Sequence, residues 1–321
     1  MQTKMLEPDI KGINAAAELL RGGETVAFAT ETVYGLGADA RNDAAVAKIF
    51  KAKDRPAFNP LIVHLADFDM LKDLAEIPDA AEKLLPLWPG PLTLVLPKKP
   101  ASGLSDLVTA GLETVAIRVP AHATARAVLQ AFGGPVAAPS ANPSGKVSAT
   151  SADHVLAGLQ GKIAAILEGG PCGVGVESTI IGFENNQMVL LRPGGVAIET
   201  ITQLTGQVPV IAKTGQITAP GQLQSHYAPD VAVRMNASEP RANEAWLGFG
   251  ANPRQAPGLN LSANANLTEA AMALFDSLRK MDAICKRNGL AGFAVAPVPD
   301  TGLGLAINDR LQRAAAPRVN G

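Results

Sequence analysis

Three short stretches of this sequence concentrate side chains that can bind anions, and each lies beside an apolar run. The first is Thr30-Glu-Thr-Val-Tyr-Gly-Leu-Gly37, which directly follows the apolar run 25–29. In open α/β sheets, ligands bind beyond the carboxyl ends of the strands, where these threonine hydroxyls would stand. A strand-to-helix turn whose hydroxyls close their own hydrogen bonds explains the composition equally well.

The second stretch places three cations within five residues, at Lys51, Lys53 and Arg55, shortly before Asn59 and Pro60. An arginine offers a planar fork to phosphate oxygens, and a lysine offers a point charge. A solvated basic end of a helix over 42–52 is an equally good interpretation. The third stretch follows the apolar residues 136–138 and contains Ser140 and Asn142. Its polar side chains can bind phosphate or ribose oxygens, or close their own turn.

Arg118 is harder to explain as a surface residue, because it lies inside the apolar run Ala116–Val119. A charge in such a run is rarely buried without a partner. Either an internal acid or a ligand carboxylate must therefore meet it. Glu177-Ser178-Thr179 and Arg192 follow the same scheme, with polar groups at the ends of predicted strands.

Common catalytic motifs are missing from the sequence. It has no GxxxxGK[ST] loop, no complete GxGxxG, no HExxH and no GxSxG. The 4 histidines are scattered, and the 2 cysteines, Cys172 and Cys285, form no CxxC pair. A zinc site, a disulfide framework and the common nucleotide-binding or hydrolase classes are therefore not expected.

Composition narrows the class of protein further. The chain has 321 residues with a net charge of -1 and 4% aromatic residues, so neither a global basic field nor many stacking platforms are available for RNA. No signal-peptide pattern and no membrane-length apolar run is present. We therefore expect a soluble, cytoplasmic protein that binds no membrane and forms no stable complex with nucleic acid.

Apolar runs alternate with helical patterns, which predicts an α/β fold with a largely buried sheet. Strands are predicted at 25–29, 61–65, 92–96, 114–119, 163–167, 178–181, 231–234, 245–249 and 292–296. Helices are predicted at 10–20, 42–50, 79–87, 121–132, 151–159, 196–205, 266–285 and 303–315. The Gly- and Pro-rich stretch 206–230 is predicted to link a domain over 1–205 to a smaller α/β domain over 231–321.

Six strings in order, TETVYGLG, K-x-R with NPLIVH, AIRVP, PSAN, ESTII and LRPG, resemble the motifs of the YrdC/Sua5 family. Ser225-His-Tyr-Ala-Pro229 resembles the HYxP signature of its longer, Sua5-type members, and Gly302–Ala314 resembles the close of their C-terminal domain. The resemblance implies a YrdC-like twisted mixed sheet with a Rossmann-like C-terminal domain. It also implies the synthesis of L-threonylcarbamoyladenylate and pyrophosphate from L-threonine, bicarbonate and ATP, with Mg²⁺ accompanying ATP. The product would pass to a tRNA threonylcarbamoyl transferase that forms N6-threonylcarbamoyladenosine.

The same resemblance implies site residues, by match to the family's positions. Catalytic elements would be Lys53, Arg55, Ser140 and Asn142. ATP would be held by Arg55, Asn59, Thr114, Ser140, Ser148, Arg192 and Tyr227, the last within a linker that closes as a lid. Threonine would be held by Thr32, His64, Arg118, Ala138 and Ser178. No metal site on the protein is expected.

Two other functions remain open for a YrdC-like fold. One is a carbamoyltransferase, although the carbamoyl-handling relatives carry cysteine-rich zinc segments that 2 cysteines cannot build. The other is an RNA-binding module, against which the neutral charge and the few aromatic residues argue.

Overall fold

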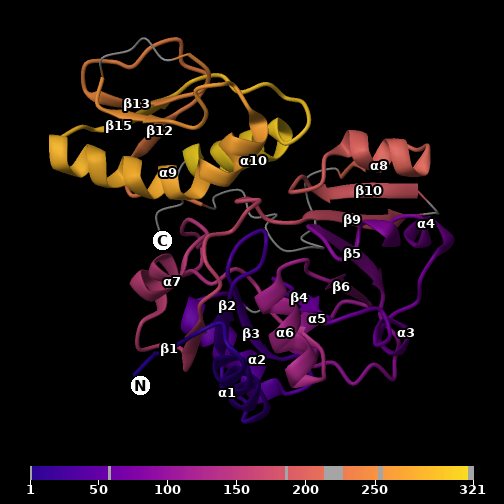
Figure 1. The fold of residues 1–321 in the computed structure, drawn as a ribbon. Coiled ribbons are helices and arrows are strands. Elements are labelled where there is room, and N and C mark those ends of the chain that lie inside the picture. Colours follow the sequence, from indigo (N-terminus) through magenta and orange to yellow (C-terminus); the bar gives the residue numbers. More distant parts are fainter. Residues whose placement is uncertain (1, 57–58, 185–186, 213–226, 252–255, 317–321) are drawn as a thin grey trace.

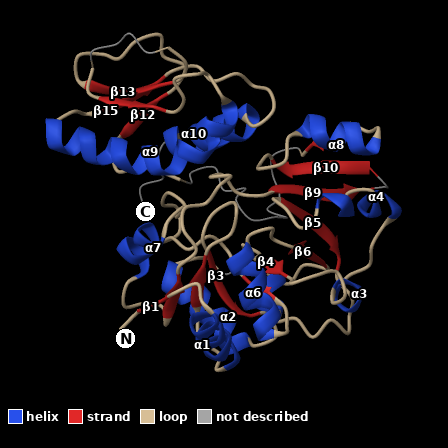
Figure 2. Ribbon diagram, in the orientation of Figure 1, coloured by secondary structure: helices blue, strands red, loops and turns tan. Residues whose placement is uncertain are grey.

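The computed structural model describes residues 2–56, 59–184, 187–212, 227–251 and 256–316. These residues form two sheets of different size (Figures 1 and 2). The larger is mixed and has the order β1-β8-β2-β3-β7-β4-β6-β5-β9-β10-β11. The smaller is parallel and has the order β12-β15-β13-β14. We call the parts built on them the large unit and the small unit.

The strands of the large unit are β1 (Lys4–Leu6), β2 (Val26–Phe28), β3 (Gly35–Asp39), β4 (Ile62–His64), β5 (Leu92–Pro97), β6 (Thr114–Arg118), β7 (Val136–Ala137), β8 (Ala165–Leu167), β9 (Thr179–Glu184), β10 (Gln187–Arg192) and β11 (Val210–Ile211). Its helices are α1 (Ile10–Arg21), α2 (Asp43–Lys53), α3 (Leu71–Leu74), α4 (Asp79–Glu82), the 3₁₀ turn η1 (Leu85–Leu87), α5 (Asp106–Thr109), α6 (Ala123–Phe132), α7 (Ala152–Leu159) and α8 (Ile198–Thr205). The small unit contains β12 (Ala232–Arg234), β13 (Glu244–Gly248), β14 (Gly258–Asn260), α9 (Leu267–Asn288), β15 (Gly292–Val295) and α10 (Gly304–Ala315).

Strand β2 shows why the large sheet is apolar on both faces. Val26 and Phe28 point to one face, where they pack in one core with Leu20 of α1. Ala27 points to the other face and belongs to a second core that includes Ile49 of α2. Successive side chains of a strand alternate between faces, so a strand covered by helices on both sides must be apolar throughout.

Helix α9 gives the small unit its own core. Asn266 caps the helix by accepting hydrogen bonds from the backbone N–H groups of Thr268 and Glu269. Leu274, Leu278 and Met281 lie on its buried stripe, at helical spacing. Helices α9 and α10 lie between the small sheet and the large unit (Figure 1), and their core also includes Val33, Val147 and Val176 of the large unit.

Most predicted elements are present, and three differences have clear causes. Residues 30–37 form no strand-to-helix turn, because from Gly35 onward they belong to β3, which pairs antiparallel with β2. The predicted helix 79–87 is interrupted, because α4 ends at Glu82 and the chain continues as the 3₁₀ turn η1, which contains Pro86. A proline lacks the N–H that would continue the α-helix. Within the predicted linker, β11 pairs with β10, and residues 213–226 lie outside the described part.

Among the described residues, no helix combines the length and the apolar character that crossing a membrane requires. Even α9, with 22 residues, carries several charges on its exposed side.

Candidate active site

A cavity opens where the ends of several strands of the large sheet meet. Thr32 follows β2, His64 ends β4, Arg118 ends β6 and Arg192 ends β10. The residues that line the cavity are Thr30, Thr32, Val33, Gly35, Arg55, Ile62, His64, Arg118, Ala138, Pro139, Ser140, Glu177, Ser178, Arg192 and Tyr227. Most of the site residues predicted from the sequence are therefore brought together, from segments far apart in the chain.

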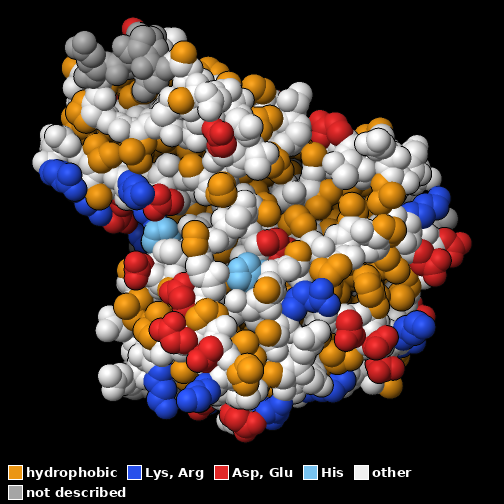
Figure 3. Space-filling model, in the orientation of Figure 1, with side chains coloured by type: hydrophobic (Ala, Val, Ile, Leu, Met, Phe, Trp, Pro, Cys, Tyr) orange, Lys and Arg blue, Asp and Glu red, His pale blue; other side chains and the backbone are white. Residues whose placement is uncertain are grey.

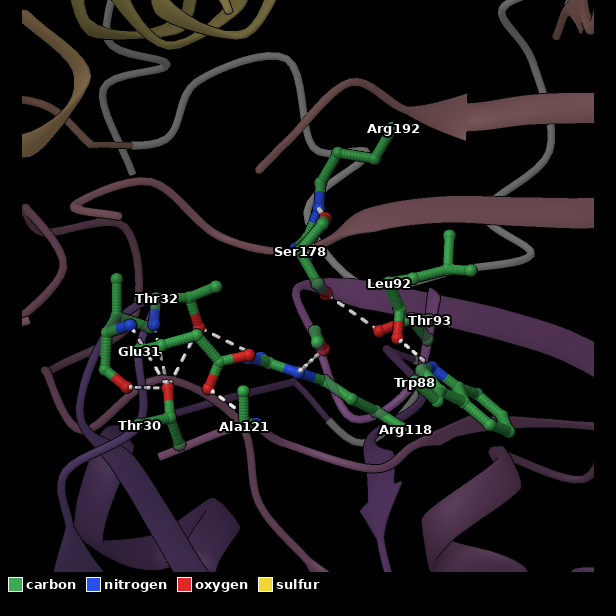
Figure 4. Close-up of polar contacts among 12 residues, drawn as sticks. Thr30, Glu31, Thr32, Trp88, Leu92, Thr93, Arg118, Ala121, Ser178 and Arg192 are labelled. Atoms are coloured by element: carbon green, nitrogen blue, oxygen red, sulfur yellow. Dashed lines mark hydrogen bonds and ion pairs between the residues drawn. The ribbon is translucent and has the colours of Figure 1, made fainter. Parts of the chain in front are cut away.

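Arg118 meets an internal acid, one of the two partners that the sequence left open. Its Nη2 donates to Glu31 Oε1 at 2.6 Å, its Nη1 to Thr32 Oγ1 at 2.8 Å and its Nε to the Gly90 carbonyl at 3.2 Å (Figure 4). Burial alone would raise the pKa of Glu31, but the Arg118 charge and hydrogen bond lower it below its usual range. Contacts among the described residues thus commit three of the five guanidinium N–H groups, and one on each of Nη1 and Nη2 has no partner among these contacts.

Thr30 behaves differently from Thr32, although both belong to the same motif. Thr30 Oγ1 accepts from the backbone N–H of Thr32 and of Val33, both at 3.2 Å, and donates to the Val33 carbonyl at 2.6 Å. It therefore closes its own turn, as the alternative interpretation of this stretch proposed. Thr32, in contact with Arg118, faces the cavity from that turn.

Ser178 is held between two other side chains at the start of β9. Its Oγ lies 2.7 Å from Thr93 Oγ1 and accepts from Arg192 Nη2 at 3.1 Å (Figure 4). Arg192 also donates to the Ser178 carbonyl, from Nε at 3.1 Å and from Nη2 at 2.9 Å. Thr93, fully buried on β5, is a site residue that the sequence analysis missed.

Arg55 and Arg192 give this side of the cavity its positive charge. Burial lowers the pKa of each guanidinium to about 10, which leaves both charged at neutral pH. Arg55 Nη2 donates to the Pro60 carbonyl at 3.0 Å, which fixes the arginine against the turn that precedes β4. Two desolvated cations on one cavity favour an anionic ligand.

Lys53 and Asn142 lie behind the cavity wall. Lys53 Nζ donates to the backbone carbonyls of Ser140 and Asn142. Asn142 Nδ2 donates to the carbonyls of Pro143 at 2.9 Å and Lys146 at 2.8 Å. Burial, with Arg55 nearby, lowers the pKa of Lys53 well below its ordinary value. Both side chains thus shape the loop that carries Ser140, and a direct contact with phosphate stays a prediction.

Asn59, Thr114 and Ser148 also lie outside the cavity lining given by the described residues. Asn59 is 1% exposed, and its amide atoms have no hydrogen-bond partner among the described residues. Thr114 begins β6, at the opposite end of that strand from Arg118. Ser148 Oγ donates to Glu177 Oε1 at 2.6 Å, so it acts on the cavity through Glu177.

His64 is buried and neutral. Burial, together with the charge of Arg118, lowers its pKa to about 3. Its Nδ1 lies 3.2 Å from the Ile62 carbonyl, and a carbonyl can only accept, so Nδ1 carries the proton. The Nε2 lone pair is then available to a donor in the cavity.

Tyr227 closes the cavity from the side of the small unit. It has a positive φ of 61°, and its ring stacks on Phe275 of α9 with the ring centroids 5.3 Å apart. The guanidinium of Arg310 on α10 lies 5.4 Å from the centre of the same ring. Ser225 and His226 of the HYxP motif, like most of the predicted lid, lie outside the described residues.

The acids at the site do not form a metal centre. In the part of the chain that the structure describes, no group of three His, Cys, Asp or Glu side chains could hold an ion. Glu31 and Glu177 both form ion pairs with arginines, at 2.6 Å and 2.8 Å. These residues do not fit a Mg²⁺ ion held by the protein itself, so any such ion would enter with a phosphate ligand.

Family models match almost the whole chain. The Sua5, YciO and YrdC model, described as "Telomere recombination", matches residues 18–194. The Sua5 C-terminal model, described as "Threonylcarbamoyl-AMP synthase, C-terminal domain", matches residues 196–316.

Similar proteins agree with these models. The chain is 44% identical over 329 residues to the threonylcarbamoyl-AMP synthase of Bacillus subtilis, covering 96% of this chain and 94% of the relative. It is 41% identical over 328 residues to the enzyme of the same name from Pyrococcus abyssi, covering 96% and 95%. The structure of P. abyssi Sua5 complexed with L-threonine matches with a TM-score of 0.88 and 40% identity over 98% of both chains.

Proposed function

The chain belongs to the Sua5, YciO and YrdC family, and on that premise we propose that it is a threonylcarbamoyl-AMP synthase, a nucleotidyltransferase that uses ATP, L-threonine and bicarbonate. The observation that carries the proposal is the cavity itself, on which Arg55, Arg118 and Arg192 converge. Three arginines suit a reaction that brings a carboxylate, a carbamate and a triphosphate together.

The substrates supply their own nucleophile. The amine of threonine attacks bicarbonate, a C–N bond forms and water leaves, which gives a carbamate. A carbamate oxygen then attacks the α-phosphorus of ATP, and the bond to the β-phosphate oxygen breaks as pyrophosphate leaves. The protein must therefore neutralise like charges and hold the groups in line, rather than provide a nucleophilic side chain.

The Arg118 side of the cavity is proposed to hold threonine. The remaining N–H groups of Arg118 would bind the substrate carboxylate. Ser178 Oγ and the neutral Nε2 of His64 offer partners to the hydroxyl or amine of threonine. A site with such polar partners discriminates strongly against an amino acid that lacks the hydroxyl.

The Arg192 side is proposed to hold ATP. Arg55 and Arg192 would face the phosphates, and Ser140 would offer a hydroxyl from the loop that Lys53 supports. Mg²⁺ would accompany the nucleotide as part of this substrate. The product would be consumed by a transferase that modifies tRNA, as the resemblance of the sequence motifs implies.

A pyrophosphate-release assay tests the proposal. Release is expected only when threonine, bicarbonate and ATP are all present, and omission of any one should abolish it. Release that is independent of threonine would contradict the assignment. The RNA-binding alternative gains no support from the face drawn in Figure 3, where basic and acidic side chains are interspersed rather than gathered in a stripe.

A further inference from the structure

Arg310 belongs to the small unit, yet two of its hydrogen bonds are made with the large unit. It is 0% exposed. Its Nε donates to Glu177 Oε2 at 2.8 Å, and its Nη1 donates to the Pro193 carbonyl at 2.9 Å and to Asp309 Oδ2 at 2.6 Å. One guanidinium therefore links α10 to two residues of the large unit, one shortly before β9 and one directly after β10.

Both of these points adjoin residues that line the cavity. Glu177 directly precedes Ser178, and Pro193 directly follows Arg192. Strands β9 and β10 are antiparallel, so the start of one lies beside the end of the other. The backbone N–H of Gly195 donates to the Glu177 carbonyl at 2.9 Å and joins the two segments. The contacts of Arg310 thus act on the place where the Arg192 side of the cavity is built.

Glu177 lines the same cavity as Arg55 and Arg192. A negatively charged side chain there opposes the binding of an anionic ligand. Burial alone would raise the pKa of Glu177, but Arg310 and then Arg192 lower it to about 2, so it is ionised at neutral pH. Without Arg310, the cation with the largest remaining effect on the Glu177 carboxylate would be Arg192. The carboxylate would then compete with a phosphate for Arg192 and repel the phosphate directly.

We propose that Arg310 is a positioning residue by which the small unit engages Glu177 and so keeps this carboxylate from competing with the phosphates of ATP for Arg192. This inference rests on the proposed function, because ATP is the anion concerned. It assigns to the small unit an effect on nucleotide affinity that does not require contact with the nucleotide. It also explains why the largest fully buried side chain of the small unit is a cation.

A double-mutant cycle on nucleotide binding tests the inference. The full-length protein is titrated with a non-hydrolysable ATP analogue and Mg²⁺, without threonine, and the Kd is measured by calorimetry. Arg310→Met is expected to weaken binding by at least about tenfold, because Glu177 then draws on Arg192. Adding Glu177→Gln to Arg310→Met removes the competing charge and is expected to restore most of that affinity. A merely structural role for Arg310 would give no such rescue, since the second substitution removes a further contact.

Arg313→Met is the matched control. Arg313 lies on the same helix and pairs with Asp309 at 3.0 Å. Glu177→Gln is expected to give no rescue in the Arg313→Met background. If Arg310→Met does not fold, Arg310→Lys replaces it, with a smaller loss and the same sign of coupling expected.

Two results would overturn the inference: a double variant that binds no more tightly than Arg310→Met, or a wild-type protein that does not bind the analogue. The pyrophosphate assay reports separately on the proposed function. A wild-type protein that binds the analogue and shows the rescue, but releases no pyrophosphate with threonine, would refute the function and retain the role of Arg310.

Discussion

Arg118 and Arg192 line the same cavity, and each has a carboxylate nearby, Glu31 and Glu177. The two carboxylates form ion pairs with arginines from different parts of the molecule. Arg118 pairs with Glu31, and both residues belong to the large unit. Glu177, beside Arg192, pairs with Arg310, which comes from the small unit. Both acids are ionised because arginines lower their pKa values. The first pair needs only the large sheet, whereas the second exists only where the two units meet.

This difference suggests that the two sides of the cavity, which we propose to bind threonine and ATP, depend on the small unit to different degrees. On the Arg118 side, the ion pair of Arg118 with Glu31 is made within the large unit. On the Arg192 side, Glu177 pairs with Arg310 of α10, and Tyr227 packs against Arg310. The proposed role of Arg310 therefore predicts that the affinity of this side for a ligand changes when these contacts are removed. The following predictions test whether the two sides respond to substitution in different ways.

The largest effect of a substitution is expected on the Arg118 side of the cavity. Arg118→Ala should lower kcat/KM for threonine by on the order of 100-fold or more, because the carboxylate loses a charged fork and meets an unpaired Glu31. Threonine-dependent pyrophosphate release measures the effect, and circular dichroism checks the fold. Adding Glu31→Gln should not restore activity, since no cation remains for the substrate. Retained threonine-dependent turnover in Arg118→Ala would refute the assignment of this side to threonine.

Lowering the pH should weaken the ion pair between Glu177 of the large unit and Arg310 of the small unit. The folded pKa of Glu177 is about 2, below its ordinary 4.5. Its stabilising effect is therefore complete above about pH 4.5 and is lost as the pH falls toward 2. The full contribution is roughly 3 kcal/mol, most of which is lost by pH 3. Urea unfolding at pH 7 and pH 3 measures the loss, and Glu177→Gln should flatten the dependence. An equally steep dependence in that variant would contradict the prediction.

A smaller effect is expected at Tyr227, on the side that depends on the small unit. Tyr227→Ala removes a ring that lies against Phe275 and Arg310 and lines the cavity. Affinity for the ATP analogue should fall on the order of tenfold. Tyr227→Phe keeps the stacked ring and should lose less. Unchanged affinity in Tyr227→Ala would mean that the residue does not close over the nucleotide.

The sequence predicts the fold well where a strand is apolar by itself. Strands β4, β5 and β6 are mostly apolar, and each was predicted within two residues of its bounds. Several strands were missed, among them β1, β3, β7, β11 and β14. Strands β7 and β11 have only two residues each, and so short a strand exists only through pairing with its neighbours. Periodicity cannot reveal an element that tertiary contacts create.

The same limit applies to the site. Arg118 was identifiable because a charge in an apolar run needs a partner, and Glu31 meets it from 87 positions away. Arg310 carries a similar signal, since helical spacing places it beside Ile307 and Ala314 on the buried face of α10. Its partner Glu177 lies 133 positions away, and no local pattern joins the two. A buried charge can be predicted from sequence, but its counter-ion cannot.

The smallest effect is expected at Thr93, which contacts neither Arg118 nor Arg192 in the described hydrogen bonds. Its hydroxyl instead holds the hydroxyl of Ser178 in place. Thr93 Oγ1 is 2.7 Å from Ser178 Oγ, and Arg192 Nη2 reaches the same oxygen at 3.1 Å. Thr93→Val keeps the shape but loses the hydrogen bond, so Ser178 keeps only its contact with Arg192. The KM for threonine should rise about threefold to tenfold, because one neutral hydrogen bond is lost. Thr93→Ser keeps the hydroxyl and serves as the control. If KM for ATP rises instead, Ser178 serves the Arg192 side, and the boundary between the two sides must be redrawn.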